Sequence, residues 1–142
     1  MRRYGSSGWL VLAACLLCRG MHAQGEFPGQ YAVSGTVKTR HVVHATLTIG
    51  LTNRSGKDLP AARLLLRGGL PSGGEQTLDA FLTIPDRSRR TIRAEISLAA
   101  RELRRWEHGA APGIWLEFLD ESGQRHSYSL HLIRTARVPE GQ

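Results

Sequence analysis

The sequence has little cysteine and little lysine. Its two cysteines, Cys15 and Cys18, both lie near the N-terminus. The chain after Cys18 therefore has neither a disulfide framework nor a cysteine-ligated zinc site. Lysine occurs only as Lys38 and Lys57, so the positive charge is almost entirely arginine. A GC-rich genome explains that bias as well as a binding role does.

Catalytic signatures are also missing. The sequence contains no Gly-x-Ser-x-Gly, Ser-x-x-Lys or His-Glu-x-x-His pattern. The glycines at 68, 69, 73 and 74 lack the Gly-Lys-Ser/Thr ending of a phosphate-binding loop. Asp120 and Glu121 are adjacent in a turn, whereas paired catalytic carboxylates converge from separate elements. We therefore expect a protein that is not an enzyme and needs no cofactor.

Long hydrophobic runs are absent too. The longest, Trp9 to Cys18, has 10 residues, well short of the roughly 18 that a membrane span requires. It follows a basic start and precedes a small-residue site at Ala23, which is the layout of a secretory signal peptide. Two interpretations stay open. Cleavage after Ala23 would release a soluble protein, or a lipobox ending at Cys15 would leave Cys15 lipidated.

The net charge is modest once the predicted signal peptide is excluded. The full chain carries a formal charge of +7. Beyond residue 23 it has 16 basic and 12 acidic residues, a net charge of +4. That balance suits a soluble exported domain and does not demand a polyanionic partner. Nucleic acid is disfavoured by export and by the absence of aromatics interleaved with the basic residues.

Alternating apolar and polar residues predict strands through most of the remaining chain. Val42–Asn53 is the clearest, with Val43, Ala45, Leu47, Ile49 and Leu51 on one face. Turn-forming residues separate the segments, notably Asn53–Asp58 and the hairpin loop Asp120–Gly123. The predicted strands are Tyr31–Lys38, Val42–Asn53, Leu59–Arg67, Thr77–Ile84, Thr91–Leu98, Ile114–Leu119 and Arg125–Arg134.

In one segment the spacing of apolar residues changes from the two-residue period of a strand to the period of a helix. Ala99–His108 places Ala99, Leu103 and Trp106 on one face of a short helix that Gly109 ends. About seven antiparallel strands with one short helix between the fifth and sixth predict an all-β, immunoglobulin-like sandwich. A partly open barrel is the competing architecture. The expected organisation is a signal peptide over 1–23, a linker over 24–30, the sandwich over 31–136 and a polar tail over 137–142.

Two stretches carry a resemblance to a known group. TLTIGLTNRSGKDLPAARLLL, from Thr46 to Leu66, resembles the second and third strands of immunoglobulin-like accessory domains in exported bacterial proteins. IWLEFLDESGQ, from Ile114 to Gln124, is similar to their penultimate strand and hairpin. The resemblance implies a spacer, adhesive module or assembly partner without shared catalytic residues.

Histidine spacing argues against a metal site. His41 and His44 are three residues apart and His126 and His131 five apart, so each pair points to opposite faces of a regular strand. Only His44 and His126 could meet, if their strands were neighbours. The sequon Asn53-Arg54-Ser55 is interpreted as turn chemistry rather than as a glycosylation site.

The predicted contact surface centres on Trp115. Alternation turns Trp115 away from the core, on the same side as Leu119. Trp115 is then either an exposed interaction residue or covered by the 99–106 helix. Arg101, Arg104 and Arg105 form a basic stripe on that helix and are expected to border the same surface.

The overall expectation is an exported, non-enzymatic module that contacts a protein or the cell envelope. A membrane contact is expected only if Cys15 is lipidated. A small-ligand or carbohydrate site at the loop Gly68–Gly74 is the alternative, and it would need aromatic side chains nearby.

Overall fold

The computed structural model describes residues 25–139. The predicted signal peptide with Cys15, and residues 140–142, lie outside this range. The described chain is an all-β sandwich with one short helix, as predicted. The strands are β1 (Gly29–Lys38), β2 (Val42–Thr52), β3 (Leu59–Arg67), β4 (Glu75–Ile84), β5 (Arg89–Ala99), β6 (Ile114–Leu119), β7 (Arg125–Ser129) and β8 (Leu132–Arg134).

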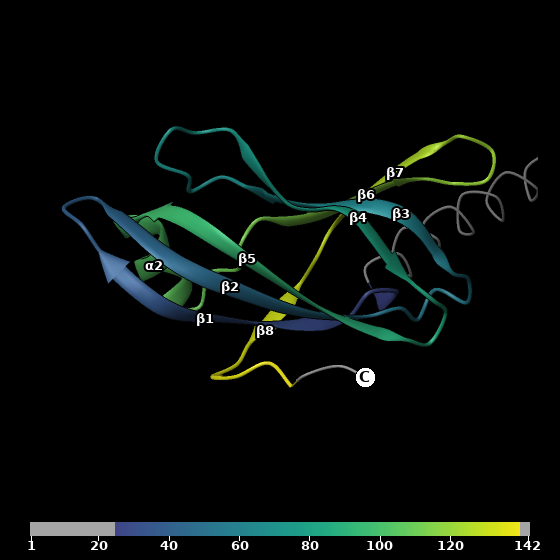
Figure 1. The fold of residues 1–142 in the computed structure, drawn as a ribbon, viewed down its shortest axis with the longest axis horizontal. Coiled ribbons are helices and arrows are strands. Elements are labelled where there is room, and N and C mark those ends of the chain that lie inside the picture. Colours follow the sequence, from purple (N-terminus) through teal and green to yellow (C-terminus); the bar gives the residue numbers. More distant parts are fainter. Residues whose placement is uncertain (1–24, 140–142) are drawn as a thin grey trace, which may run out of the picture.

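The strands form two four-stranded sheets that pack face to face (Figure 1). The order is β5-β2-β1-β8 in the first sheet and β4-β3-β6-β7 in the second. All neighbouring pairs are antiparallel except β1 and β8, which are parallel. The sheets remain separate, so the sandwich prediction is confirmed over the barrel.

The core lies between the sheets and comes from the inward residues of the alternating pattern. Leu47, Leu51, Leu64 and Leu116 are at most 1% exposed. Their outward neighbours are mostly polar, which fixes the strand register because a one-residue slip would expose the apolar face. The alternation that predicted the strands is therefore the pattern that builds the core.

The helix α2 (Ala100–Glu107) lies between β5 and β6, within one residue of its predicted bounds at each end. It buries Leu103 and Trp106. The Trp106 ring packs edge-to-face on Tyr31 of β1, with centroids 5.9 Å apart, and Trp106 Nε1 donates to Glu102 at 3.1 Å. The helix thereby closes one end of the sandwich (Figure 1).

The predicted last strand, Arg125–Arg134, is two strands in different sheets. β7 pairs with β6 in the second sheet, and β8 pairs with β1 in the first. The chain passes from one sheet to the other at Leu130, which is buried, and His131, which is exposed. Leu130 and Leu132 are both buried, so their alternation persists through the crossing and hides it from sequence reasoning.

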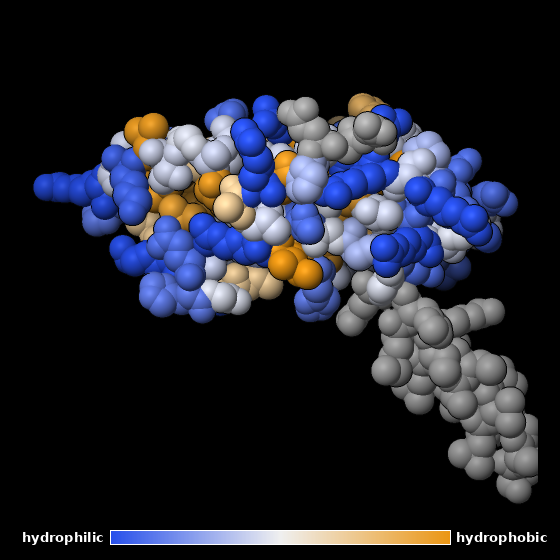
Figure 2. Space-filling view, turned by 90° about the horizontal axis from the view of Figure 1, so that it is seen from below, coloured by the Kyte–Doolittle hydropathy of each residue, from blue (hydrophilic) through white to orange (hydrophobic). Residues whose placement is uncertain are grey.

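The folded part extends beyond its predicted boundaries at both ends. Phe27, in the predicted linker, is 2% exposed and joins the core. Val138, in the predicted polar tail, is 6% exposed and packs near Gly50 of β2. Seen from below, the surface is mostly hydrophilic, with apolar residues in small separate groups (Figure 2). Within residues 25–139, no helix is both long and apolar enough to cross a membrane.

Candidate functional site

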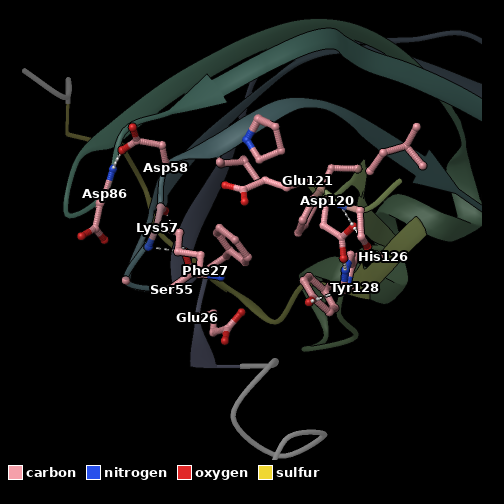
Figure 3. A pocket seen from close by; sticks show the side chains of 16 residues that line it. Glu26, Phe27, Ser55, Lys57, Asp58, Asp86, Asp120, Glu121, His126 and Tyr128 are labelled. Carbon is pink, nitrogen blue, oxygen red and sulfur yellow. Dashed lines mark hydrogen bonds and ion pairs between the residues drawn. The ribbon is translucent and has the colours of Figure 1, made fainter. Parts of the chain in front are cut away.

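An open hollow of about 1180 Å³ is lined by the side chains drawn in Figure 3. The turns that carry these side chains lie at the end of the sandwich remote from α2 (Figure 1). Turns after β2, β4 and β6 meet there with the segment before β1. We call it the acidic hollow. Its lining is Glu26, Phe27, Ser55, Gly56, Lys57, Asp58, Leu59, Pro60, Asp86, Phe118, Leu119, Asp120, Glu121, Ser122, His126 and Tyr128.

The β2–β3 turn is held by Asn53, which is fully buried. Its Nδ2 donates to the carbonyls of Lys57 at 2.7 Å and Ile84 at 2.8 Å. Its Oδ1 accepts from the backbone N–H of Ser55 at 2.9 Å and from the Ser55 hydroxyl at 2.7 Å. All four hydrogen-bonding positions of the amide are used. The sequon residues Asn53 and Ser55 therefore stabilise the turn, as predicted, and Nδ2 is not available to a glycan.

The β6–β7 hairpin is held by Asp120. Its Oδ1 accepts from the backbone N–H groups of Ser122 and Gln124, both at 2.9 Å, and from the Ser122 hydroxyl at 2.6 Å. These bonds lower the pKa of Asp120 well below its ordinary value, with Ser122, His126 and Gln124 as the causes in that order. Asp120 therefore binds the backbone amides of its own turn.

A chain of three polar groups continues from this hairpin. His126 Nε2 lies 2.8 Å from Oδ2 of Asp120, and His126 Nδ1 lies 3.3 Å from the Tyr128 hydroxyl. Burial raises the pKa of Tyr128, and the negative charges of Glu26 and Asp120 raise it further. The hydroxyl thus experiences a negative potential from the acidic hollow.

Aromatic rings form one wall of the hollow. His126 stacks on Phe118 with an interplanar angle of 17° and centroids 5.1 Å apart. Phe27 stacks on Tyr128 at 6.0 Å and meets Phe118 edge-to-face at 6.4 Å. These contacts fix the hairpin against the segment before β1, so the ring surfaces are held in place.

Four of the five carboxylates of the hollow make no ion pair with another described residue. Only Asp120 does, with His126. Asp58 Oδ1 accepts the backbone N–H of Asp86 at 2.8 Å, and Asp86 Oδ1 is buried without a hydrogen-bond partner among residues 25–139. Lys57 is the one lysine or arginine in the lining. Unpaired carboxylates beside aromatic rings are suited to holding a cation.

Leu119 is the predicted contact residue that the structure places in the acidic hollow. It is 57% exposed and belongs to the lining. Trp115 lies four residues earlier on β6, half-buried on the outer face of the second sheet. The Arg67 guanidinium lies 4.9 Å from the centre of its ring. Trp115 is therefore neither bare nor covered by α2, because an arginine of β3 covers it.

An ion-pair network surrounds Trp115. Arg67 contacts Glu117 and donates to Glu75 at 2.9 Å, and Arg63 lies 4.0 Å from Glu117. Leu65, cross-strand from Trp115, is fully buried although it faces away from the core. The tryptophan and the arginine stems thus form a small second apolar layer on this face.

The predicted arginines of α2 do not border Trp115 or Leu119 as a single surface. Arg101, Arg104 and Arg105 are exposed on the helix, at the end of the sandwich opposite to Leu119 (Figure 1). Arg105 pairs with Glu102 at 3.0 Å. Gly69 of the β3–β4 loop lies against the Glu102 side chain, so the loop Gly68–Gly74 belongs to the helix end as well.

The remaining histidines stay apart. His44 is on β2 and His126 on β7, in different sheets, and His44 Nδ1 lies 2.8 Å from the Ser97 hydroxyl. Within the described part of the chain, no three His, Cys, Asp or Glu residues are grouped as metal ligands would be.

Sequence reasoning missed Glu26, Asp58 and Asp86 as site residues. One signal could have found them. Turns that follow even-numbered strands of an antiparallel sandwich lie at the same end, and Asp58, Asp86 and the pair Asp120 and Glu121 occupy three such turns. Strand parity therefore predicts that these acids gather. The same rule places the segment before β1, with Glu26, at this end, because β1 begins where its antiparallel neighbour β2 finishes.

The chain matches no protein-family model and no curated protein. Among solved structures, it is similar to a GH20 exo-β-N-acetylglucosaminidase from Vibrio harveyi, as an inactive mutant and in complex with N-acetylglucosamine. In each case the identity is 15% and the TM-score 0.47. The match covers 80% of this chain and 18% of the Vibrio chain. A likeness of this size carries no inference about function.

Proposed function

We propose that this chain is an exported, non-enzymatic β-sandwich module that acts by contact with a protein partner, and that the acidic hollow is its contact site. The observation that carries the proposal is the set of unpaired carboxylates beside a fixed aromatic wall. Glu26 and Asp86 are half-buried, where charge without a partner is costly, whereas Asp58 and Glu121 are exposed. A cationic group entering the hollow gains both ion pairs and ring contacts.

The shape of the site favours a macromolecular partner. Small-molecule sites typically enclose about 300–1,000 Å³, and this hollow is larger and open. Its turns are held by Asn53 and Asp120, so little ordering entropy is lost on binding. Exposed Leu119 supplies apolar surface at the border of the charged groups. The aromatic wall lies at the opposite end from the loop Gly68–Gly74, which leaves the carbohydrate alternative without its expected support.

Export remains part of the proposal and rests on residues 1–23. Soluble release after Ala23 and lipidation of Cys15 predict different mature N-termini. Intact mass spectrometry of the protein recovered from expressing cells separates them. A mass that begins at Gln24 supports release, a diacylglyceryl mass on Cys15 supports an anchored form, and an unprocessed chain contradicts export.

The contact site is tested by fluorescence anisotropy with a labelled hexa-arginine peptide and a hexa-glutamate peptide. We expect binding of the arginine peptide alone, weakened by salt. The double variant E26Q/E121Q should bind roughly fivefold more weakly, since exposed charge pairs contribute modestly. The control E95Q/E107Q removes the same charge outside the hollow and should bind like the parent. Equal binding of both peptides, or equal loss in both variants, contradicts the proposal.

A further inference from the structure

We infer that the acidic hollow receives the arginine-bearing end of a second copy of this chain, so that molecules associate head to tail. The inference rests on the proposed function, because it names the partner of the same site. It uses the opposite charges of two surfaces, the lining of the acidic hollow and a basic surface at the other end of the sandwich. We call the donor surface the arginine end and define it by Lys38, Arg40, Arg101, Arg104 and Arg105.

The arginine end is built from α2 and the neighbouring β1–β2 turn. Ala100 donates its backbone N–H to the carbonyl of His41 at 2.9 Å, which holds the turn beside the helix. Lys38, the last residue of β1, and Arg40, in that turn, are exposed. Arg101 and Arg105 are four residues apart and Arg104 lies between them, so the three follow one another on the solvent side of the helix.

The acids near the arginine end neutralise only part of it. Glu102 is turned toward the protein, where it accepts from Trp106 and pairs with Arg105. The Arg105 side chain nevertheless remains 66% exposed. Glu107 is the other acid of the helix. Five basic residues against two acids leave this end positive.

The lining of the acidic hollow has the opposite sign. Five acidic residues line it against Lys57, and four of the five have no ion pair among the described residues. Arg54 and Arg87 lie in the same turns, and Arg125 begins β7 beside them, but none of the three belongs to the lining. These arginines offset the negative charge at a distance, so the hollow attracts a cation only at short range. An arginine must therefore enter the hollow to be bound. Planar guanidinium groups suit this site because they pair with carboxylates and stack on aromatic rings.

The two ends of one molecule cannot meet. The 11 residues of β2 run from one end to the other, a span of about 35 Å at the usual rise per strand residue. An arginine end that fills an acidic hollow must therefore belong to another copy. The two surfaces differ, so the contact is heterologous and leaves a free hollow and a free arginine end on every pair. Association should continue beyond the dimer as concentration rises.

Sedimentation equilibrium on the purified protein, with its N-terminus determined, tests the inference. At low salt we expect the average mass to rise beyond two protomers as concentration approaches about 1 mM, the range of a weak charged contact. About 0.5 M NaCl should reduce it to one protomer, because screening shortens the reach of exposed charges. A single protomer mass throughout overturns the inference.

Complementary variants sharpen the test. R101E/R104E lacks the arginine end, and E26K/E121K lacks the acidic hollow. Each alone should stay monomeric, because its helix and its hollow carry charge of the same sign. A mixture of the two should associate, since the unchanged hollow of one variant meets the unchanged helix of the other, and the two reversed surfaces are also opposite in charge. The control R93E/R137E makes the same change in net charge, but its two positions lie outside both surfaces. It should therefore associate like the parent.

Other outcomes are decisive in the opposite direction. Association of either variant alone at the level of the parent overturns the inference, and so does a mixture of the two variants that stays monomeric. Failure of the hexa-arginine peptide to bind is a different result and removes the proposed function as well. If that peptide binds while the parent remains monomeric, only the head-to-tail inference is lost. Thermal melts followed by circular dichroism confirm that each variant is folded.

Discussion

His126 Nε2 lies 2.8 Å from the Oδ2 atom of Asp120, and the other oxygen of Asp120 accepts three hydrogen bonds from its own hairpin. One carboxylate thus ties the β6–β7 turn to the aromatic wall of the acidic hollow. The relationship makes the turn sensitive to protonation of Asp120, because a protonated carboxyl group accepts fewer and weaker hydrogen bonds.

The lowered pKa of Asp120 predicts a loss of stability in acid. The folded protein keeps Asp120 ionised at pH values where the unfolded chain binds a proton, so unfolding takes up a proton below the ordinary pKa of 3.8. The contribution is fully present above that value and falls as pH decreases through it. Urea unfolding between about pH 5 and pH 2 should show the difference between parent and D120N narrowing toward acid. E121Q, which removes the adjacent carboxylate but leaves these hydrogen bonds, is the control. If the difference in unfolding free energy between D120N and the parent stays constant with pH, Asp120 is not the source of the acid sensitivity.

Asn53 predicts a large effect of a single polar substitution. N53A leaves the Ile84 carbonyl without the Asn53 donor and removes the acceptor of the Ser55 N–H. A buried group left unpaired costs about 1–3 kcal/mol, so we expect a loss of roughly 2–4 kcal/mol in the free energy of unfolding. Equilibrium denaturation measures it. S55A, which removes a hydroxyl but leaves the buried amide paired with Ile84, should cost less than half as much. Comparable losses in both variants would show that the buried amide is not the principal support of the turn.

The close approach of Val138 to Gly50 indicates that the C-terminal tail is part of the fold. A Cβ on Gly50 would lie 3.0 Å from Cγ1 of Val138 and collide with the Arg89 guanidinium. G50A should therefore destabilise the protein by about 1–2 kcal/mol, as overpacking does. V138A creates room, so the G50A loss measured in a V138A background should be smaller. The double-mutant cycle measures this coupling. Fully additive losses would mean that the tail does not rest on Gly50.

Trp115 predicts a stability effect separate from binding. W115A removes the ring under Arg67 and uncovers Leu65, with an expected loss of about 2 kcal/mol, below the roughly 3–5 kcal/mol of a fully buried aromatic residue. The fold should survive, since Trp115 lies outside the core between the sheets. Hexa-arginine binding should be unchanged, because Trp115 does not line the acidic hollow. A binding loss larger than that of L119A would return Trp115 to the contact surface.

The sandwich was predictable because apolar and polar residues alternate along most strands, and the apolar ones form the inward face. β3 and β6 have the predicted bounds, and the other long strands differ by one or two residues at an end. The division of the last predicted strand was not predictable. Leu130 and Leu132 remain buried on either side of a change of sheet, so the pattern is the same with or without the crossing.

The candidate site was predictable only in part. Leu119 was identified from its outward position, and it does line the acidic hollow. Trp115 was misjudged because nothing in its own strand indicates that Arg67, on a neighbouring strand, covers it. Phe27 was placed in a linker because a single aromatic residue beside proline and glycine gives no period. Its burial depends on Phe118 and Tyr128, which are about 90 and 100 residues away in sequence and reach it only through the fold.

The most direct test of the contact site is a titration of the ¹⁵N-labelled protein with the hexa-arginine peptide, followed by amide chemical shifts. Binding at the acidic hollow predicts saturable shifts at Ser55–Asp58 and Asp120–His126, with the loop Gly68–Gly74 unaffected. E26Q/E121Q should weaken the same shifts, and salt should suppress them. Shifts that centre on the outer face around Trp115, or that never saturate, would contradict the account.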